Sequence, residues 1–142
     1  MNTQIFCVQT PSVNATWLNP LNAGRNNWNI HANFPGTISS TQGCLNLLNV
    51  GIYGQGWLGL YTPVIVGSRY QINLDSSEIN SHVKAMGYTF ANVVTSTTAH
   101  EYGHALKLDH TPTSTHLMSH NRNRNVVTGP TTGEVNESNG YY

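Results

Sequence analysis

The stretch that decides the fold and the chemistry of this chain is HEYGHALKLDH, from His100 to His110. His100 and His104 are four residues apart, so on an α-helix their imidazoles lie on one face, one turn apart. Both rings can then reach one zinc ion. Glu101 is rotated by about 100° from His100, which places its carboxylate beside the metal without ligating it. From there it can take a proton from zinc-bound water, whose pKa the metal lowers to about 7.

The residues before this motif predict the helix that carries it. Val93, Thr97, His100 and His104 follow one another at steps of four, three and four, so they share one helical face. The predicted helix runs from about Thr89 to Leu106. Its four threonines and one serine make it intrinsically weak, so it needs packing or a metal to hold it.

Two histidines leave a protein metal site under-ligated, so a third ligand is expected from a segment that folds back. His110 lies six residues past His104, but a continuing helix would swing it away from the metal. We therefore predict that the helix ends near Leu106 and that His110 completes the site. Glu134 or Glu137 is the alternative third ligand, as in glutamate-ligated zinc hydrolases.

These residues resemble the metzincin zinc endopeptidases, whose signature HExxHxxGxxH is followed by a methionine turn. After HEYGHALKLDH the chain reads TPTSTHLMS, with Met118 eight residues past His110. That spacing is similar to the matrixin branch. The resemblance implies His100, His104 and His110 as ligands of one catalytic Zn²⁺. It also implies Glu101 as general base and Met118 as the turn residue beneath the metal.

Two positions depart from the family pattern. Lys107 stands where the family has glycine, and a left-handed conformation costs other residues roughly 1–2 kcal/mol. We expect a packed domain to tolerate that cost. His120, two residues past Met118, stands where matrixins usually have proline and other branches have a tyrosine that helps at the metal. It is either a hydrogen-bond donor to the developing oxyanion or an ordinary surface histidine.

The remaining elements are predicted from short apolar runs and turn residues. Asn19 and Pro20 offer an N-cap and a first-turn proline for a helix over residues 20–29. Asp75 and Glu78 resemble a capping box that starts a helical turn. The predicted strands are 5–8, 30–34, 37–40, a central strand 45–53, an edge strand 57–62 that Pro63 ends, and 69–74. A short closing helix is expected over residues 131–139.

The edge strand is the predicted substrate site. The stretch GWLGLYTP, residues 56–63, is similar to the edge strand that pairs with extended substrates in matrixin-like domains. An edge strand has free N–H and C=O groups and can bind a peptide by strand addition. The residues expected to bind substrate are Trp57, Leu58, Gly59, Leu60 and Tyr61. An ordinary edge strand without this role is the alternative.

Together these patterns predict an α+β fold with a twisted mixed sheet, one antiparallel edge strand, an active-site helix and a second long helix. Residues 1–142 are expected to form a single zinc-peptidase domain. The acid-rich segment that binds calcium in animal matrixins has no good match, so we interpret Asp75 and Glu78 as capping and surface residues. Cys7 and Cys44 form either one disulfide or two separate thiols. A third option, in which Cys7 caps a zinc ion in a latent form, has no supporting motif.

Composition and charge argue against some classes of binding partner. The formal net charge is +0, which argues against a nucleic-acid binder. No apolar run approaches the ~20 residues of a membrane span. Only 8% of residues are charged, and Asn, Thr and Ser are abundant. Such a surface is common on exported proteins, but composition alone does not place the chain. We expect a secreted protein whose signal peptide is not in this chain, and we expect a monomer.

The predicted function is hydrolysis of peptide bonds in protein or peptide substrates. The alternative is a zinc-bound binding or toxin module without catalysis on the same scaffold. Retention of Glu101 favours the enzyme, because binding alone needs no general base.

Overall fold

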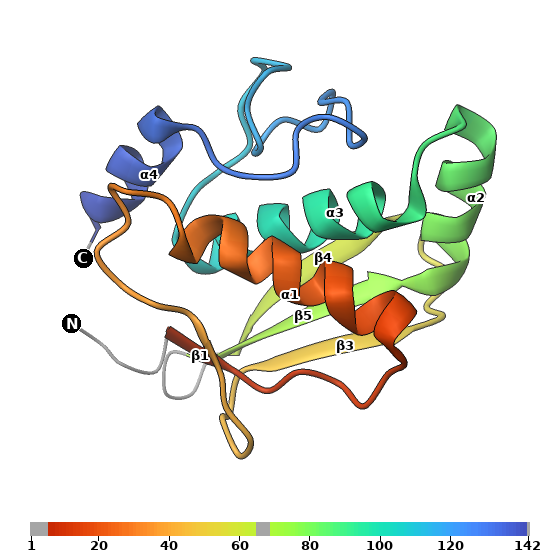
Figure 1. Ribbon diagram of the computed structural model, residues 1–142, viewed down its shortest axis with the longest axis horizontal. Helices are drawn as coiled ribbons and strands as arrows, with labels where there is room; N and C mark the ends of the chain where they lie inside the picture. The colour runs from red at the N-terminus through yellow and green to blue at the C-terminus, as the bar shows by residue number, and fades with distance from the viewer. Residues whose placement is uncertain (1–5, 65–68, 142) are drawn as a thin grey trace.

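The computed structural model describes residues 6–64 and 69–141 and has an α+β fold (Figure 1). Its elements, in chain order, are β1 (Cys7–Val8), α1 (Ala15–Asn29), β2 (Ser39–Ser40), β3 (Leu47–Gly51), β4 (Gly59–Val64), β5 (Arg69–Asp75), α2 (Ser76–Met86), α3 (Phe90–Ala105) and α4 (Thr132–Asn139). Helices α1 and α3 lie side by side over the sheet of β3, β4 and β5. No helix in these two ranges is long and apolar enough to cross a bilayer.

The sheet is mixed, as predicted. Strand β5 pairs in parallel with β3 and antiparallel with β4, giving the order β3-β5-β4 with β4 at an edge. The central-strand prediction for residues 45–53 is wrong within this sheet, because β5 occupies the middle. A bridge from Gln9 to Leu47 covers the other side of β3, and β1 pairs with β2 nearby. The predicted strand 5–8 is therefore confirmed for Cys7 and Val8, whereas Ile5 lies outside the described residues.

The first helix starts earlier than predicted. It begins at Ala15, and the side chain of Asn14 caps it by accepting a hydrogen bond from Trp17 N–H. Pro20 therefore lies inside the helix, where proline normally removes a hydrogen bond and is disfavoured. Pro20 is nevertheless buried, and its carbonyl accepts a hydrogen bond from Thr95 Oγ1 at 3.3 Å, so tertiary contacts hold the helix at this residue.

Two strand predictions are also corrected. Residues 30–34 form turns rather than a strand, because Phe34 N–H bonds back to His31 O at 2.9 Å and Ile30 is 78% exposed. Pro63 does not end the edge strand, which continues to Val64. At an edge, the missing proline N–H faces away from the sheet and costs no ladder hydrogen bond. Of the run 37–40, only β2 is a strand.

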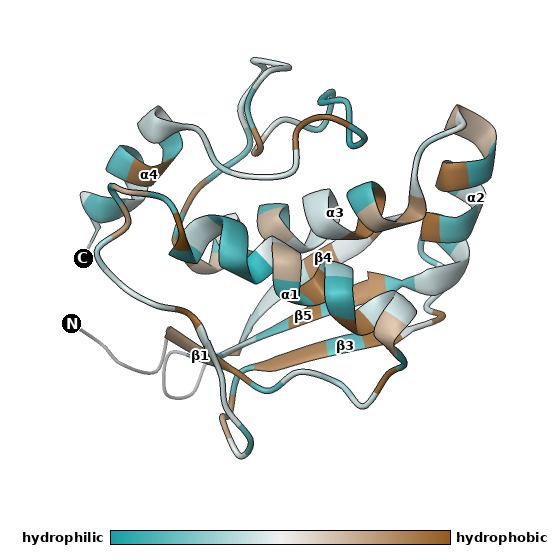
Figure 2. Ribbon diagram, in the orientation of Figure 1, coloured by the Kyte–Doolittle hydropathy of each residue, from teal (hydrophilic) through white to brown (hydrophobic). Residues whose placement is uncertain are grey.

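Helices α1 and α3 pack closely at Gly24. A Cβ built there would lie 2.7 Å from Thr98 Cβ and 2.9 Å from Thr95 O, so only glycine lets the backbones approach this far. One turn later Trp28 is fully buried, and its indole N–H donates to Ala99 O at 2.9 Å. Hydrophobic colour gathers on β3, β5 and parts of the helices, while the long segment that follows α3 is mostly pale or polar (Figure 2). The core thus fixes the position of α3.

The two cysteines form a disulfide. Cys7 and Cys44 are joined with a Cα–Cα distance of 6.1 Å, across a loop of 37 residues. The bond ties β1 to the loop that precedes β3. Of the alternatives that the sequence left open, the disulfide is confirmed.

Asp75 organises the junction between β5 and α2. It is the N-cap of α2, where Oδ1 accepts hydrogen bonds from Ser77 and Glu78 N–H at 3.0 Å. Its Oδ2 accepts from Tyr53 and Gly54 N–H at 2.9 and 3.0 Å. Both carboxylate oxygens therefore have backbone donors, which confirms the capping role. The hydrogen bond from Glu78 N–H is the largest of the causes that lower the pKa of Asp75.

We predict an acid-labile contribution to stability from Asp75. Its folded pKa lies below the ordinary value of 3.8, so its contribution is fully present above about pH 4 and is lost as pH falls through the folded pKa. Chemical unfolding between pH 2.5 and 6 should show a smaller acid loss for Asp75→Asn than for wild type. Glu137→Gln, an exposed carboxylate on α4, should keep the wild-type slope. An unchanged slope in Asp75→Asn would contradict the assignment.

Candidate metal centre

Three imidazoles converge at the C-terminal end of α3. The Nε2 atom of His110 lies 3.2 Å from that of His100 and 3.1 Å from that of His104. These three form the group among the described residues that could hold a metal ion. The helix prediction is confirmed, since α3 runs from Phe90 to Ala105 with Thr89 as N-cap. His110 reaches the helical pair from beyond the end of the helix.

Backbone carbonyls orient the two helical histidines. His100 Nδ1 contacts Leu117 O and His104 Nδ1 contacts Leu108 O, each at 2.8 Å. A carbonyl only accepts, so each Nδ1 carries the proton and each neutral ring presents an Nε2 lone pair. Burial, the largest cause, lowers the pKa of His100 to about 2 and also lowers the pKa of His104 and His110. The rings are therefore neutral at physiological pH, as metal ligands must be.

The donor set fits a metal cation. The Nε2 lone pairs of His100 and His104 point at Nε2 of His110. A cation between the three nitrogens would be coordinated by them and would remove the repulsion between their lone pairs. Imidazole nitrogens suit zinc, copper, iron and nickel, so the donor chemistry alone does not fix which metal binds.

The chain reversal after α3 brings His110 back. Leu108 N–H bonds to Gly103 O at 2.9 Å and Lys107 N–H bonds to His104 O at 2.9 Å, which is the Schellman pattern of helix termination. Lys107 has φ 70°, the left-handed conformation that the pattern requires. Among the described residues it is the one non-glycine with positive φ. The predicted turn is thus confirmed, with lysine in the strained position.

The Leu117–Met118 turn holds two of the three histidines in place through its backbone carbonyls. Leu117 O holds His100, and Met118 O accepts a hydrogen bond at 3.1 Å from Thr111 N–H, next to His110. The Met118 side chain is buried against Gly103, where an added Cβ would overlap its sulfur. Position 103 therefore has to be glycine, because the Met118 side chain fills the space that a Cβ would need.

Glu134, one of the alternative third ligands, has a different partner. Its Oε1 accepts a hydrogen bond from Leu117 N–H at 2.8 Å and another from Thr131 Oγ1 at 3.2 Å. It supports the turn from α4, whose predicted position is confirmed with Thr131 as N-cap. Neither Glu134 nor the exposed Glu137 belongs to the converged group among the described residues.

Glu101 lies beside the histidines and is almost fully buried. It is 5% exposed, and burial raises its pKa to about 7. Arg122, the backbone N–H of Tyr61 and Arg124 oppose that rise by favouring the carboxylate. Gly59 also touches Glu101, since a Cβ there would lie 3.1 Å from Oε1 and 2.7 Å from Thr97 Cγ2.

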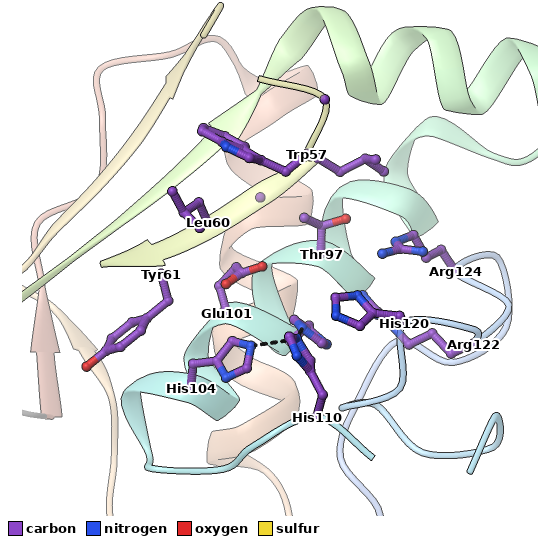
Figure 3. A pocket seen from close by; sticks show the side chains of 14 residues that line it. Trp57, Leu60, Tyr61, Thr97, Glu101, His104, His110, His120, Arg122 and Arg124 are labelled. Carbon is purple, nitrogen blue, oxygen red and sulfur yellow. Dashed lines mark hydrogen bonds between the residues drawn. The ribbon is translucent and has the colours of Figure 1, made fainter. Parts of the chain in front are cut away.

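The edge strand forms one wall of a cleft of about 480 Å³ over the histidines (Figure 3). The five predicted substrate residues, Trp57, Leu58, Gly59, Leu60 and Tyr61, all line it. Leu58 O accepts a hydrogen bond from Asp75 N–H. Because antiparallel pairing alternates, the N–H and C=O groups of Gly59 and Tyr61 point away from β5. These edge groups therefore face the cleft side, and the Tyr61 N–H bonds to Glu101.

The cleft is also lined by residues that no sequence motif indicates. Arg122 and Arg124 come from the segment after Met118, whereas Thr97 lies on the predicted face of α3, next to Gly59. The available signal was NRNRN, residues 121–125, which holds two of the six cationic residues of the chain. His120 is exposed but lines the cleft, with its ring centroid 3.7 Å from that of His110.

The chain matches no protein-family model, and it matches no curated protein either. The metzincin resemblance therefore stays a prediction from the motif.

We predict that glycine at position 107 is at least as good as lysine. Lys107→Gly relieves a left-handed strain of about 1–2 kcal/mol, offset in part by about 0.4–1 kcal/mol of extra unfolded-state entropy. Denaturant unfolding should give a free energy equal to wild type or about 1 kcal/mol higher. Lys107→Ala keeps the Cβ and should gain nothing. Clear destabilisation by glycine would contradict the termination geometry.

Proposed function

We propose that residues 1–142 form the catalytic domain of a secreted, monomeric zinc endopeptidase of the metzincin type, similar to matrixins. The observation that carries the proposal is the convergence of three histidine Nε2 atoms beside the buried carboxylate of Glu101, in a cleft walled by a free sheet edge. The Cys7–Cys44 disulfide supports an exported location. The sequence has no good match to the acid-rich segment that binds calcium in animal matrixins, so we do not propose a structural calcium ion.

His100, His104 and His110 would hold the zinc. When bound, zinc supplies a Lewis acid that polarises the peptide carbonyl and activates water. Imidazoles fixed by Leu117 O and Leu108 O keep their lone pairs directed at one point, so no rearrangement is needed.

Glu101 moves the proton. Its carboxylate accepts a proton from the attacking water and delivers it to the departing amine. A pKa raised to about 7 by burial suits both directions of transfer at neutral pH. The Tyr61 N–H fixes the carboxylate against the wall of the cleft.

The free edge of β4 would bind the substrate backbone. A peptide that adds beside β4 forms main-chain hydrogen bonds with Gly59 N–H and with the outward carbonyls of Gly59 and Tyr61, while the Tyr61 N–H stays on Glu101. Such bonds form without regard to sequence, which suits an endopeptidase. Side chains of that peptide then fall alternately toward α3 and toward solvent.

The decisive experiment separates zinc binding from catalysis. Glu101→Gln keeps the shape and an acceptor for Tyr61 N–H but cannot take a proton. It should retain one zinc per chain by elemental analysis and lose about 10²–10⁴-fold in casein or peptide cleavage. Glu137→Gln is the matched control and should retain both. Wild-type cleavage should stop with a chelator and return with zinc.

Several outcomes would refute parts of this proposal. Zinc-loaded wild type that cuts no peptide across a varied pool would favour the non-catalytic binding module. Retention of zinc by His110→Ala, with loss of zinc by Glu134→Gln, would assign the third ligand to Glu134.

His120 is the proposed oxyanion donor, since it lines the cleft and its ring lies 3.7 Å from that of His110, tilted by 43°. We predict that His120→Ala lowers kcat by at least about tenfold while zinc content stays at wild-type level. His31→Ala, outside the cleft, should leave kcat unchanged. An unchanged kcat in His120→Ala would make His120 an ordinary surface histidine.

A further inference from the structure

Two arginines form one end of the cleft. Arg122 and Arg124 line it together with Gly56 and Trp57, at the end where β4 begins (Figure 3). Arg122 is 4% exposed, and Arg124 is partly buried. Placing cations in a buried setting is costly unless an anion accompanies them.

Arg122 is held rigidly by neutral groups. Its Nε donates to Ser96 Oγ at 2.9 Å, and its two terminal nitrogens donate to Ser119 O at 2.9 Å and Ser96 O at 3.3 Å. These partners fix the guanidinium but do not neutralise it. Arg122 therefore contributes a stationary positive charge behind the cleft wall.

Two buried donors at this end have no partner. Within residues 6–64 and 69–141, Arg124 Nε and Thr97 Oγ1 are buried polar atoms without a hydrogen-bond partner. Thr97 is 2% exposed, and both residues line the cleft. In Figure 3 the hydroxyl oxygen of Thr97 lies on the side toward Arg124. A carboxylate, which only accepts and offers about four lone-pair sites, would satisfy both donors.

The only carboxylate among the residues lining the cleft is Glu101. Glu101 therefore shares the cleft lining with two cations, while Glu134 acts on Arg122 from α4. The unpartnered donors Arg124 Nε and Thr97 Oγ1 are what a substrate anion would satisfy at this end.

The direction of the substrate follows from β4. Antiparallel pairing, which β4 already has with β5, would run the peptide from Val64 toward Gly59. The residue that follows the bond nearest Glu101 then lies toward Arg124.

Building on the proposed peptidase function, we propose that this end of the cleft is a subsite for an acidic side chain. The subsite binds the aspartate or glutamate side chain that directly follows the cleaved bond. Arg124 and Thr97 donate hydrogen bonds to its carboxylate, and Arg122 adds a positive charge nearby.

The first test compares substrates. Mass spectrometry of casein fragments locates a cut site, and quenched peptides around it then carry Glu, Gln or Leu directly after the cut bond. We expect kcat/KM to be about tenfold higher for Glu than for Gln, with a ratio that shrinks as salt rises. Equal values, a preference for Leu, or an acidic preference only before the bond would overturn the proposal.

The second test changes the arginine. Arg124→Gln should reduce the Glu-to-Gln ratio of kcat/KM to about one, and Arg124→Glu should shift preference toward a Lys peptide. Arg25→Gln removes an equal charge from α1, outside the cleft, and should keep the wild-type ratio. If Arg124→Gln instead lowers kcat equally for all peptides, the arginine serves only Glu101 and the subsite is refuted. Should Arg124→Glu not fold, Arg124→Gln decides alone.

A binding measurement separates this inference from the peptidase proposal. Zinc-loaded Glu101→Gln should bind the Glu peptide about tenfold more tightly than the Gln peptide by fluorescence anisotropy. If wild type cuts nothing, the peptidase function fails, and a pair of extended peptides that differ only in one Glu or Gln residue then decides the subsite by the same binding measurement. Equal binding of the two peptides would overturn it.

Discussion

The left-handed conformation of Lys107 is the constraint on which the histidine cluster depends. Because the helix stops there, Leu108 turns its carbonyl to His104 Nδ1, and the chain heads back so that His110 meets the helical pair. A further turn of helix would remove both effects at once. One strained residue therefore sets the tautomer of one histidine and the position of another.

Backbone carbonyls supply the hydrogen bonds that orient the histidine cluster. Leu117 O and Leu108 O orient two rings, while Met118 O holds Thr111 beside the third. Metal-binding histidines often rely on carboxylates for this purpose, but main-chain carbonyls serve equally well. This explains how a chain with six acidic residues can organise a three-histidine site. Glu134 is the one carboxylate with a related role, and it acts indirectly: it accepts a hydrogen bond from Leu117 N–H, and Leu117 O orients His100.

What could be predicted from the sequence was local. The helix over His100 and His104, its end near Leu106 and the reversal at Lys107 follow from spacings within eleven residues. The start of the first helix was predicted too late because proline is most common in the first turn. The contacts that bury Pro20 within the helix, such as Thr95 Oγ1 on its carbonyl, come from far along the chain. Arg122 and Arg124 were missed for a related reason. No spacing links them to Glu101, and folding alone brings them to the same cleft.

Helix α3 shows how a weak helix becomes a rigid support. Its hydroxyls are poor for helix formation because they compete for backbone groups. Here Thr95 donates to Pro20 O and Ser96 donates to Val127 O, so the same hydroxyls fasten the helix to its neighbours. Thr98 bonds within the helix to Val94 O. These contacts lie within the protein itself, so packing and hydrogen bonds hold the helix that carries two of the ligands. Thr97 is the exception among the hydroxyls of residues 95–98, because its hydroxyl is buried in the wall of the cleft without a hydrogen-bond partner. At that position a bound substrate supplies the missing acceptor.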